Sequence, residues 1–357
     1  MHDEPLKCLL VAGRFEVRGS CGYSLRLLEH LPAYGVEPHL VCSSSARVPA
    51  VKRSRLPIRE LRFLTTPVLS RLAVRQLCEQ WEDDPPDLVH AQTRMVAGAG
   101  MRIAEALEVP YIITVHDIPL KGQRFRFNPQ WGRAIVAVSS AVRDELVGVA
   151  GVPSELVHVI PSGVEVEPST VSPAKTPANP VPVVGSAGPL ETVKGHAHFL
   201  RAAAAVLSAG WDVEFMLAGT GPEEAHLRSL ARDLEIADHV TFVPHVQEYG
   251  EVLQAIDVFC LPSLQEGFGI VFAEAMTAGM PIVALSAGAV PEFVTHGVNG
   301  FLAPPGDDAA LGEALAALLA GPDLRSRMGR ANADHAPGRF DLVAAADRFL
   351  TAVGPLI

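Results

Sequence analysis

Residues 258–285 read VFCLPSLQEGFGIVFAEAMTAGMPIVAL, and their pattern is the clearest indication of the fold. The run VFCL predicts a buried strand, and the run PIVAL predicts the next one. Between them, the pattern over 270–278 predicts a helix that Gly279 caps. Two continuous apolar strands joined by a glycine loop and a helix predict one unit of a parallel α/β sheet.

The same alternation runs through both halves of the chain. In the first half, buried strands are predicted by the runs KCLLVAG, HLVCS, DLVHA, YIITVH and AIVAVS. In the second half they are predicted by PVVGSAG, VEFMLAG and HVTFVP before the stretch quoted above. A chain of 357 residues suits two domains. The predicted fold class is therefore α/β, with two Rossmann-like, doubly wound domains facing a central cleft.

Composition sets the predicted boundaries. Residues 166–180, VEPSTVSPAKTPANP, are dense in Pro, Ser and Thr and predict a linker. We expect it to separate an N-terminal domain, 1–165, from a C-terminal domain, 181–335. A helical segment, 336–357, follows and is expected to pack back on the N-terminal domain.

Charge and composition exclude several classes of protein. The net charge of −11 divides into +1 for residues 1–165 and −12 for 166–357, which argues against a general nucleic-acid binder. No apolar run reaches membrane-spanning length, and the N-terminus lacks the pattern of a signal peptide, so we expect a cytoplasmic protein. The five cysteines are widely spaced and predict buried, reduced thiols, and no cluster of residues predicts a metal site.

The loop before the predicted helix carries the candidate chemistry. Glu266 is followed by Gly267, Phe268 and Gly269, and these glycines let the backbone approach a ligand closely. The free N–H groups at the start of the helix suit a phosphate. Glu274 lies one to two turns into the helix, where it can face the same cleft as Glu266. Two carboxylates at different depths suit a ligand rich in hydroxyl groups.

This segment resembles the E-x7-E signature of retaining GT-B glycosyltransferases of family 4. Further landmarks of that family occur in the same order: PDLVHAQ, ITVHD, AVSSAVRDEL, VIPSGVE, GTGPEEAHLRSLA and GAVPEFVTHGVNGFLAPPGD. The resemblance implies transfer of a hexosyl group from a nucleotide diphosphate sugar to a hydroxyl acceptor (glycan, lipid or small molecule). It also implies retention of anomeric configuration, no cofactor and no catalytic metal. By the same resemblance the first domain binds the acceptor and the second binds the donor.

The resemblance also implies a role for each residue of the loop. Glu274 would contact the donor ribose, and Glu266 would contact the donor sugar. The backbone amides of Phe268, Gly269 and Ile270 would hold the diphosphate.

Three residues outside this loop match landmarks of the family. Lys194 would neutralise the leaving diphosphate, His116 would approach the reacting sugar, and Gly19 would lie near the donor. The residues alone leave other interpretations open. Lys194 can be an exposed lysine before a helix, and His116 can be a structural histidine.

The chain departs from the family at one phosphate-binding position, where Pro189 stands in place of the usual arginine. Losing a comparable electrostatic stabiliser typically costs about 2.7 to 4 kcal/mol of transition-state stabilisation. Two alternatives to the transferase stay open, and Pro189 bears on the second of them. One is a sugar-nucleotide 2-epimerase of the same fold, and the other is a catalytically weak nucleotide-sugar-binding protein.

The segment from Arg47 to Arg75 is rich in arginine and lysine, with Glu60 as its one acidic residue. Its apolar residues are interleaved with the basic ones. A solvated face is one interpretation. The other is peripheral attachment to the inner face of the membrane, or capture of an anionic acceptor.

Overall fold

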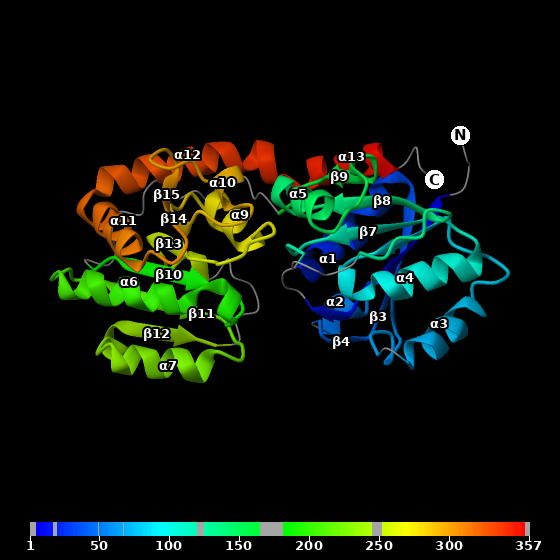
Figure 1. Cartoon of the computed structure of the whole chain (residues 1–357), viewed down its shortest axis with the longest axis horizontal. Helices are drawn as coiled ribbons and strands as arrows, with labels where there is room; N and C mark the ends of the chain where they lie inside the picture. Colours follow the sequence, from blue (N-terminus) through cyan, green and yellow to red (C-terminus); the bar gives the residue numbers. More distant parts are fainter. Residues whose placement is uncertain are drawn as a thin grey trace. The chain divides into compact units, whose positions relative to one another are not determined.

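The structure, a computed structural model, describes residues 5–16, 20–48, 50–66, 68–119, 125–164, 181–244 and 252–353. The chain divides into two compact units. The first unit comprises Met1–Gly163 and Leu342–Ile357, and the second comprises Val164–Asp341. Figure 1 shows both units, coloured along the chain. Gly19 and the predicted linker, 166–180, lie outside the described residues.

The first unit is built on a seven-stranded sheet of order β5-β3-β1-β6-β7-β8-β9, in which neighbouring strands are parallel. The strands are β1 (Leu6–Val11), β3 (Val36–Cys42), β5 (Ile58–Glu60), β6 (Leu88–Ala91), β7 (Tyr111–Val115), β8 (Gly132–Ala137) and β9 (Val157–Val159). A small two-stranded sheet pairs β2 (Arg14–Glu16) with β4 (Ser44–Arg47). The helices are α1 (Ser20–His30), α2 (Ala50–Arg53), α3 (Ser70–Cys78), α4 (Arg94–Leu107), α5 (Ser140–Gly148) and α13 (Leu342–Val353).

The C-terminal helix α13 packs on the first unit, where it contacts α1. Its Phe349 is buried in the same hydrophobic cluster as Leu10 of β1 and Ile112 of β7. The helix before it, α12 (Pro322–Phe340), packs against α9 and belongs to the second unit. The second unit thus continues through the expected boundary at 335 and ends at Asp341, because α12 runs on without a break.

The second unit contains a six-stranded sheet of order β12-β11-β10-β13-β14-β15, again with parallel neighbours. The strands are β10 (Val183–Ala187), β11 (Glu214–Ala218), β12 (Val240–Val243), β13 (Val258–Leu261), β14 (Ile282–Leu285) and β15 (Gly300–Ala303). The remaining helices are α6 (His196–Ser208), α7 (Glu224–Asp233), α9 (Ile270–Thr277), α10 (Val290–Phe293) and α11 (Asp308–Ala320). Strand order reverses between β10 and β13, which makes their junction a topological switch point.

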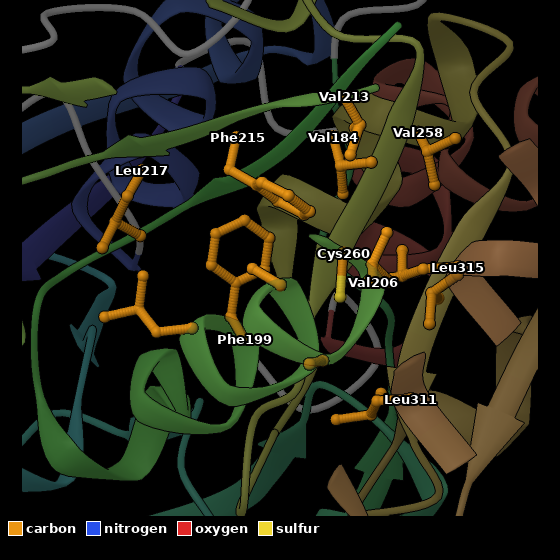
Figure 2. Packing of buried hydrophobic residues seen from close by; sticks show 14 of the residues in the cluster. Val184, Phe199, Val206, Val213, Phe215, Leu217, Val258, Cys260, Leu311 and Leu315 are labelled. Carbon is orange, nitrogen blue, oxygen red and sulfur yellow. The ribbon is translucent and has the colours of Figure 1, made fainter. Parts of the chain in front are cut away.

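The core of the second unit forms where α6 and α11 cover the sheet. Figure 2 shows Phe199 of α6 directed toward Phe215 of β11, and their ring centroids are 5.8 Å apart in an edge-on arrangement. Val184 and Val258, on the two strands of the switch point, lie in the same buried cluster. Close packing of this kind fixes the positions of the strand ends, and hence of the loops that follow them.

The predicted doubly wound α/β fold is confirmed, with differences at the edges of the sheets. The sequence analysis did not identify β5, β9 or β15, each of which has three or four residues and lies at a sheet edge. Such short strands carry too little hydrophobic pattern to stand out from a loop. The helix predicted over 270–278 is observed as Ile270–Thr277, with Gly279 in the left-handed region at φ 71°. The described cysteines Cys8, Cys42, Cys78 and Cys260 are buried, as predicted.

Candidate functional site

Two residues that are far apart in the sequence meet at the switch point of the second unit. Lys194 follows β10, and Glu266 follows β13. The Nζ atom of Lys194 donates to Oε2 of Glu266 at 2.8 Å, and the hydroxyl of Ser263 donates to the same oxygen at 3.0 Å. In open α/β sheets, ligands bind beyond the carboxyl ends of the strands at this point. The contact therefore marks the candidate site of the unit.

Local backbone geometry holds Lys194 in place. Residues Thr192–Lys194 form a short 3-10 helix that ends at Gly195, whose φ is 68°. A Cβ atom on Gly195 would lie 1.8 Å from the carbonyl oxygen of Pro262, so the two loops touch backbone to backbone. The amide of Leu264 also donates to the carbonyl of Val193 at 2.8 Å. The lysine loop and the glutamate loop are thus fixed to each other beside the salt bridge.

Glu266 is buried, with 5% of its surface exposed. Its backbone carbonyl accepts from the amide of Ala289 at 2.8 Å, which ties its loop to the segment after β14. A carboxylate at such a depth is costly to desolvate unless it is paired, and Lys194 and Ser263 supply that pairing. The pair presents one cation and one anion at the carboxyl edge of the sheet.

The glycine loop leads directly into α9. Gly269 is the N-cap residue of that helix at φ 79°, and a Cβ atom there would lie 2.6 Å from the ring of Phe272 and 3.2 Å from the Glu266 side chain. Glycine is therefore required at this position on two grounds. The first amides of α9, beginning at Ile270, have no partner within the helix and are suited to an anion. Glu274 lies one turn further along and is half-buried.

Phe268 has a packing role that the sequence analysis did not identify. Its ring is buried and lies against Phe293 of α10 and Phe340 of α12, with centroid distances of 6.4 and 5.7 Å. This aromatic contact anchors the loop, so that Gly267 and the Phe268 backbone are held next to Glu266. An aromatic residue between two glycines does indicate that its ring is packed. The residues that the ring contacts lie too far along the chain to be predicted from the sequence.

The segment with Pro189 is rigidly held. The amide of Leu190 donates to the carbonyl of Thr220 at 3.0 Å, and Gly219 packs against the carbonyl of Gly188. The buried His196 reaches the carbonyl of Pro189 through Nε2 at 3.1 Å, while its Nδ1 lies 3.3 Å from the hydroxyl of Ser186. Burial lowers the pKa of His196 to about 4, so at neutral pH the ring is uncharged. His196 positions this loop, a role that the sequence analysis did not identify.

In the first unit, His116 follows β7 and is half-buried. Its ring lies edge-on to Tyr23 of α1 with centroids 5.1 Å apart. Its Nε2 atom is buried and has no hydrogen-bond partner among the described residues. Burial lowers its pKa to about 4, although Asp117 opposes this shift, so His116 is neutral near pH 7. Depending on its tautomer, a neutral ring can use this nitrogen to donate one hydrogen bond to a ligand or to accept one from it.

Neighbouring polar residues in the first unit have structural roles. His90 bonds Thr114 through Nε2 at 2.7 Å and stacks on Phe349 of α13, with centroids 5.1 Å apart. Burial lowers the pKa of His90 to about 3. Gln92 accepts from the hydroxyl of Ser24 at 2.7 Å, which links β6 to α1. These contacts fix the strand ends beside His116.

Over the part of the chain that the structure describes, no group of three His, Cys, Asp or Glu side chains is arranged to hold a metal ion. Over the same residues, no helix is both long and apolar enough to cross a bilayer.

Known proteins resemble this chain in sequence over most of its length. The family model described as "Glycosyl transferases group 1" matches residues 170–335, and that of "Glycosyltransferase Family 4" matches 19–168. A phosphatidyl-myo-inositol mannosyltransferase of Mycobacterium leprae is 32% identical over 292 residues, which cover 78% of this chain and 76% of the relative. A 2-deoxystreptamine glucosyltransferase of Streptomyces kanamyceticus is 25% identical, with 84% and 89% covered.

Solved structures share the fold. The HepE protein of Anabaena, in complex with UDP and glucose, superposes with a TM-score of 0.83 at 22% identity, covering 98% of this chain and 100% of that one. Sucrose-phosphate synthase of Thermosynechococcus elongatus superposes with a TM-score of 0.77 at 19% identity, with 98% and 99% covered. The family matches, the mycobacterial relative and the GT-B fold agree, and the chain belongs to the group 1, family 4 glycosyltransferases.

Proposed function

We propose that this glycosyltransferase moves a hexosyl group from a nucleotide diphosphate sugar to a hydroxyl acceptor, with retention of configuration and without a metal ion. The observation that carries the proposal is the contact between Lys194 and Glu266 at the switch point. It supplies a cation for the leaving diphosphate and a carboxylate for sugar hydroxyls within one buried site. No cofactor is required, because the nucleotide sugar is itself a substrate.

The proposed roles follow from charge and geometry. In the transfer, the bond from the anomeric carbon to the diphosphate breaks, and its electron pair leaves on the phosphate oxygen. The acceptor oxygen forms the new bond to that carbon, and the acceptor proton passes to the diphosphate. Lys194, the amide of the N-cap residue Gly269 and the first amide of α9, that of Ile270, would stabilise that growing charge. Glu266 would accept from the donor sugar and Glu274 from the ribose. His116, neutral near pH 7, would bond the reacting sugar through its free nitrogen.

Relatives suggest where a donor screen should begin. The HepE structures were obtained with UDP, with UDP and glucose, and with UDP-glucose. The relatives named above are a mannosyltransferase and a glucosyltransferase. These names support a hexose as the transferred group and uridine as the first base to test, with guanosine and adenosine as comparisons.

We expect at least one of UDP-glucose, GDP-mannose and ADP-glucose to raise the melting temperature of the intact protein. A ligand present at 100 times its Kd stabilises the folded state by about 2.7 kcal/mol. The measurement is a thermal-shift titration with each nucleotide sugar. Glu274→Ala should weaken the response to the matching nucleoside as well as to the full donor, since its proposed contact is the ribose.

Analysis of the products formed from the donor that binds distinguishes glycosyl transfer from other activities. Incubation without an acceptor should return the donor sugar with its C2 configuration unchanged. Appearance of the 2-epimer would replace the proposal with an epimerase. Binding without turnover in the presence of glycan, lipid and small-molecule hydroxyl acceptors would leave a binding protein. An intact protein that responds to none of the donors would refute the donor-site assignment.

The basic segment from Arg47 to Arg75 supports a further proposal, peripheral contact with anionic lipid. Phe63, Val68 and Leu72 are exposed by 52%, 76% and 66% in a segment where arginine predominates. Exposed apolar side chains beside cations suit an anionic bilayer surface. The side chains of Arg47 and Lys52 lie outside the described set.

We therefore expect the protein to float with vesicles that contain anionic phospholipid and not with vesicles of neutral lipid. Each basic residue near an anionic membrane contributes about 1 kcal/mol of electrostatic binding free energy. Because salt screens this attraction, adding salt should weaken the binding. A variant with Arg59, Arg62 and Arg71 changed to glutamine should bind less, whereas Arg228→Gln, in the second unit, should bind like the parent. Equal recovery of the triple variant and the parent would exclude this segment as the contact.

A further inference from the structure

A groove of about 610 Å³ lies in the first unit between β9, α5 and α13. Its polar lining residues are Arg143 of α5, His158 of β9, and Asp347, Arg348 and Thr351 of α13. The volume is in the range of small-molecule sites, about 300 to 1,000 Å³. None of the residues proposed above for donor or acceptor lines this groove. It is therefore a separate feature that the transfer reaction does not explain.

Arg348 is the unusual member of the lining. Its Nε and Nη2 atoms are buried and have no hydrogen-bond partner within the described residues. The adjacent Asp347 points to solvent and makes no ion pair with Arg348 among those residues. Two buried guanidinium nitrogens without an acceptor are costly, because their lost hydration is not replaced. An anion in the groove would remove that cost.

The surroundings of Arg348 suit a phosphate group. Thr351 lies three residues further along α13, on the same face of the helix, and brings a hydroxyl donor. Arg143 stands across the groove, and its own partner Asp144, bonded at 2.7 Å, is not part of the lining. His158 adds a ring nitrogen from β9. The planar fork of a guanidinium matches phosphate oxygens in pairs, which a single point charge does not.

We propose that this groove binds the phosphate group of a small phosphorylated molecule, with Arg348 as the main contact. Thr351, His158 and Arg143 complete the site. A bound phosphate would connect α13, which ends the described chain, to β9 at the edge of the sheet. The proposal does not depend on the donor site, because the two sites share no residue.

Hydrogen exchange locates the site in the full-length protein. Inorganic phosphate, compared with chloride at equal ionic strength, should slow exchange in Leu342–Val353 and Val157–Val159. Glucose 6-phosphate is the second probe, and a larger effect than that of phosphate would identify a phosphorylated metabolite as the ligand. Protection confined to the loop around Glu266 would mean that phosphate binds only at the candidate donor site, and would overturn the proposal.

Arg348→Met tests the main contact. It should raise the Kd for phosphate, followed through the hydrogen-exchange protection of α13, by about tenfold or more. The reason is that a hydrogen bond to a charged group contributes about 1.5 to 3 kcal/mol. In chloride it should be at least as stable as the parent, because it removes two buried nitrogen atoms that have no hydrogen-bond acceptor among the described residues. The control is Arg228→Gln, an arginine of the second unit whose side chain is 42% exposed, which should respond like the parent. An undiminished response in Arg348→Met would refute the site.

A second variant keeps the proposal testable if Arg348→Met does not fold. Arg143→Gln removes the cation on the opposite wall, where the side chain is 42% exposed and its loss is tolerable for folding. A weaker phosphate response at α13 in this variant supports the groove. The same response as in the parent overturns it.

Discussion

Replacing Lys194 by methionine is expected to lower kcat/KM for the active donor by about 10² to 10³, because one stabiliser of the leaving diphosphate is lost. The usual arginine is replaced by Pro189, so Lys194 carries more of this task than it would beside a second cation. Methionine keeps most of the side-chain length without the charge. Steady-state kinetics with the donor identified by the thermal-shift screen provide the measurement.

The same change should reduce stability, since among the described residues it leaves Ser263 as the remaining side-chain donor to the buried Glu266. Breaking a buried pair typically costs about 3 to 5 kcal/mol, and the 20% exposure of Lys194 places this case toward the low end. The double variant Lys194→Met with Glu266→Gln removes both charges. It should recover stability without recovering turnover, which separates folding from catalysis. A Lys194→Met enzyme that keeps the parent's kcat/KM would refute the proposed role.

The sequence could predict the secondary-structure elements that surround the site but not the side-chain contacts within it. The strand, glycine loop and helix of 258–285 follow from local pattern, because apolar runs, glycines and helix caps act over a few residues. The salt bridge joins residues 72 positions apart and depends on β13 lying beside β10. That neighbour relation is set by packing of whole strands, which no local pattern encodes.

Other features of the molecule also could not be predicted from the sequence, because they depend on contacts between residues far apart in the chain. The bond from His196 to the carbonyl of Pro189 was not predicted, because it depends on where a loop turns back. Phe268 was considered for its backbone, whereas its ring packs on α10 and α12. The groove beside β9 depends on a strand of three residues and on a helix from the far end of the chain.

Gly195→Ala is expected to destabilise the second unit more than Gly210→Ala, a change at a similar φ. Two costs add. At φ 68° an alanine is strained by about 1 to 2 kcal/mol. Its Cβ would also lie 1.8 Å from the carbonyl oxygen of Pro262, so the loops holding Lys194 and Glu266 must separate. We expect a total loss of about 3 kcal/mol or more in unfolding free energy, measured by denaturant titration, together with weaker donor binding.

Gly210→Ala is the matched control, because it separates backbone strain from loop contact. Gly210 lies in the same unit at φ 85°, and a Cβ atom there would meet nothing within 4 Å. Its replacement should cost only the strain of about 1 to 2 kcal/mol and leave donor affinity unchanged. Equal losses of stability and affinity in the two variants would show that the approach of Gly195 to Pro262 does not hold the site together. A larger loss in Gly195→Ala, with the affinity effect confined to it, would tie donor binding to the backbone contact beneath the Lys194–Glu266 pair.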